Sequence, residues 1–106
     1  GYKTTNGFVS VGPSNESVLS VLEYPSEDLQ YRPLATVLEG SKLEDKATGL
    51  VATSRVSHAT PAAFASHVDN RDNENEIMEQ MVYEGIGVVF GGGSRHLIPE
   101  AEGGKR

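Results

Sequence analysis

The sequence predicts an α/β fold in which a mainly parallel sheet is flanked by helices. The first observation behind this prediction is that segments with helical periodicity alternate with short runs rich in β-branched residues, an order typical of parallel sheets. The second is the glycine content, 12 of 106 residues, concentrated at turns and chain ends, which fits a chain with many loop crossings. Both observations favour a layered fold over a helical bundle.

The N-terminal part opens with a turn signal, Thr5-Asn6-Gly7, followed by a β-prone run from Phe8 to Val11. Another apolar run begins at Val18. Residues 24–33 are polar, contain two prolines and show no periodicity, so they predict a surface loop or insertion.

The middle of the chain predicts a helix, a strand and a short helix. Thr36 and Glu39 have the spacing of a capping box, which predicts a helix over 36–46 that closes near Gly49. The run "GLVATSRV" that follows predicts a short strand. The next segment, "PAAFASHV", predicts a short helix with Thr60 as its N-cap and Pro61 at its first position.

The C-terminal part predicts a longer helix and a buried strand. The helix covers about 74–84, with an apolar stripe and a stop at Gly85; the stripe comprises Ile77, Met78, Met81 and Val82. "IGVVF" then predicts a buried strand, ended by Gly91-Gly92-Gly93. The charged, glycine-rich tail from Glu100 is expected to fray.

Composition limits the function. At 106 residues the chain is long enough for one small domain. A net charge of −6 argues against a nucleic-acid binder, which needs a basic face, although local cations or a metal could still bind an anionic substrate. The sequence has no cysteine, which excludes disulfides and thiolate metal sites, and no apolar run long enough to span a membrane.

The window "HATPAAFASHVDNRD", residues 58–72, concentrates the candidate functional residues. It follows the strand at 50–53, and ligands of parallel sheets gather beyond the carboxyl ends of strands. Taken singly, His58 fits a hydrogen-bonding loop residue, Thr60 a helix cap and Arg71 a solvated charge. The acidic residues that follow suit the first turns of a helix and are interpreted as structural; they are Asp72, Glu74, Glu76 and Glu79. The residues alone therefore predict one anion-binding loop.

Three stretches of the chain resemble alkaline phosphatases. "GYKTTNG" is similar to the segment that follows the nucleophile helix in that family. "ATGLVATSRVSHATPAAFASHVDNRDNENEI" is similar to a strand-and-loop block of the family, and "VVFGGG" to a strand that closes with a triple glycine. The resemblance implies a segment of the layered alkaline-phosphatase-like fold.

The resemblance also implies a role for each of three residues. Arg71 matches the arginine that holds the substrate phosphate, for which a planar guanidinium is suited because it can bind two oxygens at once. Thr60 matches a hydroxyl ligand of magnesium, a metal that favours oxygen ligands. His58 matches a position where some members carry an aspartate and others a histidine, and a histidine there is expected to hydrogen-bond the waters or neighbouring ligands of the magnesium ion.

The implied reaction is hydrolysis of phosphate monoesters through a phosphoserine, with two zinc ions and one magnesium ion. The nucleophilic serine is expected before Gly1 and most metal ligands outside residues 1–106. We therefore expect the chain to be an internal segment of one catalytic domain, inactive alone, in a homodimeric periplasmic or secreted enzyme. A noncatalytic α/β binding or interaction domain on the same scaffold is the alternative. A diesterase or phosphomutase of the same superfamily fits less well, because these do not usually share "HATPAAFASHV".

Overall fold

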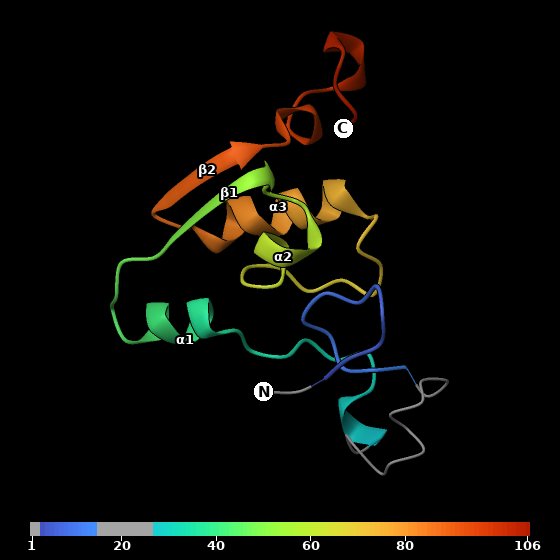
Figure 1. The fold of residues 1–106 in the computed structure, drawn as a ribbon, viewed down its shortest axis with the longest axis vertical. Coiled ribbons are helices and arrows are strands. Elements are labelled where there is room, and N and C mark those ends of the chain that lie inside the picture. The colour runs from blue at the N-terminus through green and yellow to red at the C-terminus, as the bar shows by residue number, and fades with distance from the viewer. Residues whose placement is uncertain (1–2, 15–26) are drawn as a thin grey trace.

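The computed structural model describes residues 3–14 and 27–106 (Figure 1). The regular elements along the chain are α1 (Val37–Leu43), β1 (Gly49–Arg55), α2 (Ala59–Ala62), α3 (Glu74–Glu84) and β2 (Val88–Gly92). Three short 3-10 helices accompany them: η2 (Glu27–Leu29), η3 (Ser94–His96) and η4 (Glu100–Glu102). In the part of the chain described here, no helix is both long and apolar enough to span a bilayer.

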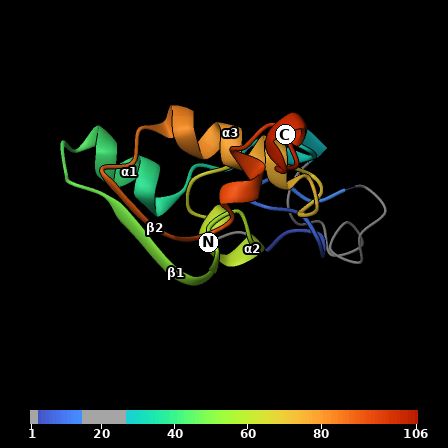
Figure 2. The same cartoon turned by 90° about the horizontal axis from the view of Figure 1, so that it is seen from above.

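The two strands form a parallel pair, as predicted. Gly49 lies opposite Val88 and Val51 opposite Phe90, with an irregularity in register before Arg55 pairs with Gly92. The connection between the strands runs through α2 and α3, and this crossover is what a parallel pair requires. Viewed from above, the strands lie on one side of α1 and α3 (Figure 2). The predicted α/β class is confirmed.

The two longer helices begin as the sequence predicts. Thr36 accepts a hydrogen bond from the backbone of Glu39, and the Glu39 side chain accepts one from the backbone of Thr36, so the capping box is present. α1 nevertheless ends at Leu43, earlier than the predicted residue 46. α3 ends at Gly85, whose left-handed backbone (φ +66°) favours glycine.

The prediction that Thr60 caps the short helix is wrong. α2 begins two residues earlier than predicted, at Ala59 instead of Pro61, with His58 as its N-cap, and it ends at Ala62. Its first intrahelical bond runs from the backbone N–H of Ala62 to the carbonyl of His58. Pro61 therefore occupies the third helical position, which tolerates proline because the first-turn N–H groups have no partner inside the helix.

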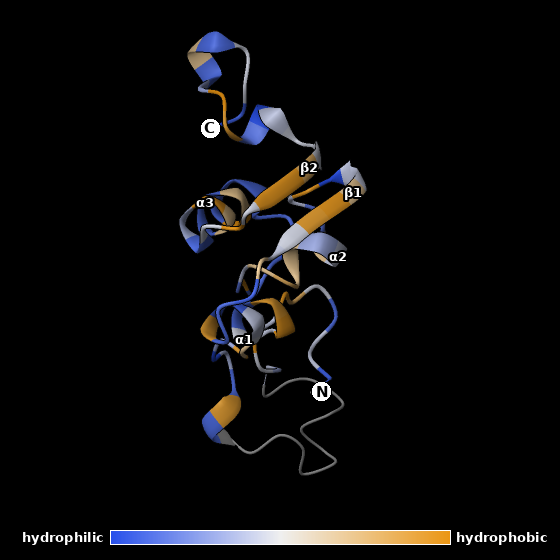
Figure 3. Cartoon of the chain, turned by 90° about the vertical axis from the view of Figure 1, so that its left-hand side faces the viewer, coloured by the Kyte–Doolittle hydropathy of each residue, from blue (hydrophilic) through white to orange (hydrophobic). Residues whose placement is uncertain are grey.

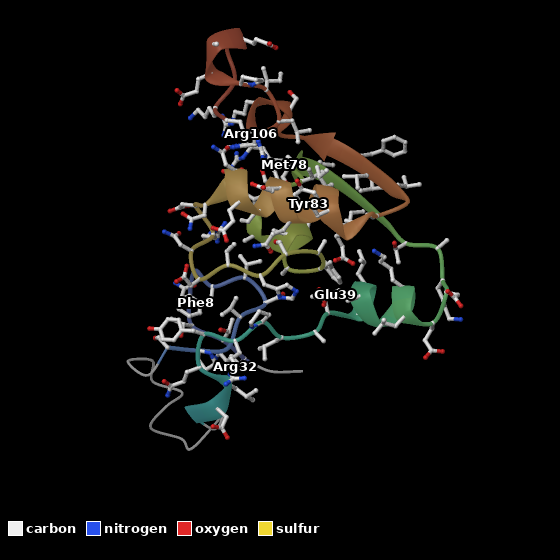
Figure 4. The ribbon with its side chains drawn as sticks, turned by 180° about the vertical axis from the view of Figure 1, so that it is seen from behind. Phe8, Arg32, Glu39, Met78, Tyr83 and Arg106 are labelled. Carbon is white, nitrogen blue, oxygen red and sulfur yellow. The ribbon has the colours of Figure 1, made fainter. Side chains whose placement is uncertain are left out.

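The hydrophobic core lies between α3, α2, the end of β1 and the N-terminal segment. It comprises Val9, Leu38, Val56, Ala62, Ala65, Val68, Ile77, Met78 and Met81. Met78 is labelled on α3 in Figure 4, and its methyl group lies beside Gly93, just after β2. Val82 was expected in this stripe but is 60% exposed.

The prediction that the last strand is buried is also wrong. Phe90 is 66% exposed, and Val51 opposite it on β1 is 76% exposed. The apolar residues occupy the middle of β1 and the first part of β2 (Figure 3). A run of apolar residues becomes buried only where other elements cover both faces of the sheet, and the described residues supply helices on one side only.

Both ends of the described chain differ from expectation. Gly7 completes the predicted turn, but the run at 8–11 forms isolated bridges from Val9 to Val68 and from Val11 to Pro33 instead of a regular strand. The tail is folded rather than frayed, because Gly103 reverses the chain and the backbone N–H of Lys105 donates to the carbonyl of Arg95.

The run that begins at Val18 and residues 24–26 of the 24–33 segment lie outside the described residues. The rest of that segment contains η2, and Tyr31 and Arg32 hydrogen-bond through their backbones to Gly12.

Candidate functional site

The carboxyl end of β1 leads directly into the window that the sequence singled out. After Arg55 the chain turns, with the backbone N–H of His58 donating to the Arg55 carbonyl at 3.0 Å. Val56 is tied to the neighbouring strand through the Gly92 carbonyl, and Ser57 is fully buried. His58 is therefore presented from a well-anchored segment at the edge where ligands of parallel sheets bind.

Arg71 reaches the same edge from the loop that precedes α3. Its backbone N–H donates to the carbonyl of Gly7 at 2.8 Å, which attaches the loop to the N-terminal turn. The guanidinium is exposed, and its Nη2 lies 3.2 Å from Nε2 of His58. A guanidinium can only donate, so Nε2 of His58 accepts and carries no proton in this contact. The side chains of Arg71 and His58, 13 residues apart in sequence, are thus hydrogen-bonded to each other.

Thr60 lies on the first turn of α2, two residues after His58, and is exposed. Because His58 rather than Thr60 occupies the N-cap position, the Thr60 hydroxyl is not engaged as a helix cap. It offers a hard oxygen of the kind that magnesium prefers. Within residues 3–14 and 27–106, no three His, Cys, Asp or Glu side chains are grouped closely enough to hold a metal ion. Thr60 and His58 therefore fit a magnesium site only as part of a larger ligand set.

A second polar cluster, which the sequence analysis did not predict, joins the end of β1 to the start of α3. Its centre is Glu74, whose two carboxylate oxygens accept from Nε and Nη2 of Arg55 at 2.7 and 2.8 Å. The Ser57 hydroxyl donates to the same carboxylate at 2.6 Å. Glu74 does occupy the first helical position, as expected, but its carboxylate pairs with Arg55 across 19 residues of sequence.

These contacts explain the electrostatics of the cluster. Hydrogen bonding to Arg55 lowers the pKa of Glu74 to about 2, and the bond from Ser57 adds to this effect, although burial opposes it. His96, almost fully buried, lies 3.2 Å from the Glu74 carboxylate. Burial lowers the pKa of His96, and nearby Glu74 only partly offsets that effect. Nδ1 of His96 lies 2.8 Å from the Asn75 side-chain oxygen, which suits a neutral ring protonated at Nδ1.

His67, the other histidine of the window, contacts a different part of the molecule. Its Nε2 lies 2.6 Å from Glu39 and its Nδ1 lies 2.8 Å from the carbonyl of Ser10. Burial raises the pKa of Glu39, but the hydrogen bonds with His67 and Thr36 outweigh burial and bring the pKa below its ordinary value. Glu39 lies at the start of α1 (Figure 4). His67 thus links α1 to the N-terminal segment and does not join His58.

Comparison with known proteins identifies the family. The sequence profile of the family "Alkaline phosphatase" matches residues 1–106. The chain is 42% identical over 80 residues to the repressible alkaline phosphatase of Saccharomyces cerevisiae, covering 71% of this chain and 14% of that protein. It is 50% identical over 78 residues to alkaline phosphatase 3 of Bacillus subtilis, covering 61% of this chain and 17% of that protein.

A solved structure agrees with this match. It is that of a histidine-to-aspartate mutant of TAB5 alkaline phosphatase, from an Antarctic bacterium, with Mg bound in the M3 site. The match has a TM-score of 0.70 and 30% identity, and it covers 89% of this chain and 22% of that one. The chain thus spans less than a quarter of the length of each of these three relatives. With its whole length matched by the family profile and its fold shared with a solved member, the chain belongs to the alkaline phosphatase family.

Proposed function

We propose that this chain forms part of an alkaline phosphatase that hydrolyses phosphate monoesters, and that Arg71 binds the phosphate. The observation that carries the proposal is the contact between the exposed guanidinium of Arg71 and His58 at the carboxyl end of β1. This contact orients the arginine at the edge of the sheet where ligands bind in α/β folds. Family membership supplies the class of reaction.

The chemistry of Arg71 suits a phosphate monoester. A guanidinium has several N–H donors in one plane, and the contact with His58 occupies only one of its nitrogens. The remaining donors can bind two nonbridging oxygens together, which fixes the phosphate and offsets the negative charge that collects on those oxygens. Because these 106 residues carry a net charge of −6, a local cation such as Arg71 favours binding of an anionic phosphate at this position.

Thr60 and His58 belong, in this proposal, to the magnesium site. The exposed Thr60 hydroxyl would be a ligand, while His58 would hydrogen-bond near the ion and hold Arg71. A relative of similar fold, a TAB5 alkaline phosphatase mutant, has Mg bound in its M3 site, which supports the proposal of a magnesium site. When bound, magnesium and two zinc ions supply positive charge beside the phosphate.

The remaining assignments rest on the family resemblance. The nucleophilic serine and the zinc ligands are proposed to lie outside residues 1–106, so that these residues form an internal segment of one catalytic domain in which 24–33 is a surface loop. The complete enzyme is proposed to be a homodimer located in the periplasm or outside the cell. Below, "complete enzyme" means the whole alkaline phosphatase that contains this segment.

Replacing Arg71 in the complete enzyme tests the proposal. A charge-assisted phosphate contact contributes about 1.5–3 kcal/mol, so Arg71→Ala should lower kcat/KM by about ten- to two-hundredfold. Arg71→Lys should recover only part of the loss, because an ammonium cannot bind two oxygens side by side. An Arg71→Ala variant that folds and keeps its full kcat/KM would contradict the proposal and favour a noncatalytic role for the window.

A further inference from the structure

The Glu74 carboxylate holds together the two segments that present His58 and Arg71. One partner, Arg55, is the last residue of β1, and the other, Ser57, directly precedes His58. Glu74 itself begins α3, three residues after Arg71. A single side chain therefore connects the strand end that carries His58 to the helix start that follows Arg71.

The loop between Arg71 and Glu74 is short and internally bonded, so a movement of the helix start would reach Arg71. The backbone N–H of Asp72 donates to the Asn70 side chain at 2.9 Å, and that of Asn73 donates to the Asn70 carbonyl at 3.1 Å. On its other side the loop is held by the bond from the Arg71 N–H to Gly7. Because of these bonds, the loop has little freedom to change its conformation, so a shift of the start of α3 would displace Arg71 as well.

The Glu74 contacts are also better defined than a surface ion pair. The Glu74 side chain is only 14% exposed, its two oxygens both bind Arg55, and the buried Ser57 fixes the carboxylate plane. Bidentate pairs of this kind fix geometry as well as supplying energy. An exposed ion pair with a single contact fixes the geometry less well and contributes less free energy.

We propose that Glu74 is a positioning residue for phosphate binding, which acts by clamping the start of α3 to the end of β1 and so holding Arg71 against His58. This inference rests on the proposed role of Arg71. Glu74 does not touch the phosphate. Its effect on catalysis passes entirely through the placement of the arginine, and small displacements of a substrate-binding group are costly in rate.

The test compares Glu74→Gln with Glu84→Gln in the complete enzyme, using inorganic phosphate as a competitive inhibitor. Glu84, at the opposite end of α3, forms an ion pair with Lys42 at 3.1 Å and is the matched control. Glu74→Gln should raise the inhibition constant of phosphate about three- to tenfold, because Arg71 is less well placed. Glu84→Gln should leave this constant within about twofold, because its ion pair lies far from the loop in sequence and contributes as an ordinary partly exposed pair.

A double-mutant cycle separates positioning from general destabilisation. If Glu74 acts through Arg71, then Glu74→Gln should have little further effect on the phosphate inhibition constant in an Arg71→Ala background. Ser57→Ala removes the hydrogen bond from Ser57 to Glu74 and keeps the ion pair with Arg55, so it should cause a smaller rise in the phosphate inhibition constant. This variant replaces Glu74→Gln in the test if Glu74→Gln does not fold.

The outcomes are distinguishable. If Arg71→Ala weakens phosphate inhibition while Glu74→Gln and Ser57→Ala leave it unchanged, the positioning role is overturned and the proposed function stands. A Glu74→Gln effect of equal size with and without Arg71 would likewise overturn positioning. If Arg71→Ala itself leaves phosphate inhibition unchanged, the proposed function fails, and the positioning role fails with it.

Discussion

The Glu74 cluster should make the stability of the 106-residue chain depend on acid pH. Glu74→Gln keeps the size of the side chain but removes the negative charge that Arg55 and Ser57 bind. Lowering the pKa of Glu74 from 4.5 to about 2 corresponds to roughly 3 kcal/mol, at 1.36 kcal/mol for each pKa unit. Arg55 is 37% exposed, so solvent weakens the pair, and we expect about 2–3 kcal/mol.

The direction of the pH dependence follows from the lowered pKa. Above pH 4.5, the pKa of Glu74 in the unfolded chain, the carboxylate is ionised in both the folded and the unfolded chain. Its full contribution to the stability of the folded chain is then present. As pH falls from about 5 towards 2, the unfolded state takes up a proton more readily than the folded state, and this contribution is lost. The difference between wild type and Glu74→Gln should therefore be largest near pH 7, and most of it should be lost by the time the pH reaches the folded-state pKa of about 2.

Urea unfolding at a series of pH values measures this difference. The matched control is Glu76→Gln, which lies in the same first turn of α3 but on a different side of the helix, where its exposed carboxylate accepts one bond from Gln80 at 3.3 Å. That variant should change the free energy of unfolding by less than about 0.5 kcal/mol. A wild-type advantage over Glu74→Gln that is below 1 kcal/mol at pH 7, or that stays constant down to pH 3, would refute the reasoning.

The remaining predictions concern metal and activity. Replacing His58 by Asp in the complete enzyme should change the magnesium affinity, because a carboxylate is a harder ligand than an imidazole, while the zinc content stays the same; metal analysis and magnesium titration of activity check this. Equal magnesium dependence in both proteins would remove His58 from the site. The 106-residue chain alone should show no turnover of a chromogenic phosphate ester with or without zinc and magnesium, and turnover above a blank preparation would contradict the placement of the nucleophile outside the chain.

Features that depend on neighbouring residues in sequence could be predicted well. The capping box of Thr36 and Glu39, the start of α3 and its stop at Gly85 all follow from local backbone chemistry, and the structure confirms them. The parallel pairing of β1 and β2 followed from the order of elements. The start of α2 was placed two residues late, because proline is tolerated throughout the first turn and does not mark the first position alone.

Features that depend on distant residues could not be predicted from local patterns. The pairing of Glu74 with Arg55 joins the end of a strand to the start of a helix, and only the fold brings them together. Two sequence signals pointed towards it: Arg55 lies next to the end of the predicted strand "GLVATSRV", and Glu74 opens a predicted helix. The exposure of Phe90 depends on what covers the sheet, which the residues of the strand do not encode. The contact of His58 with Arg71 likewise joins residues 13 apart in sequence, in a loop that is also bonded to Gly7.

The most direct test of the account is the inhibition constant of inorganic phosphate for the Arg71→Ala variant of the complete enzyme, measured beside its melting temperature. Product and substrate present the same oxygens to the guanidinium, so losing the bidentate contact should weaken phosphate inhibition by about ten- to two-hundredfold. The melting temperature should change little, because the Arg71 side chain is exposed. An unchanged inhibition constant in a variant that melts like the wild type would mean that Arg71 does not bind phosphate.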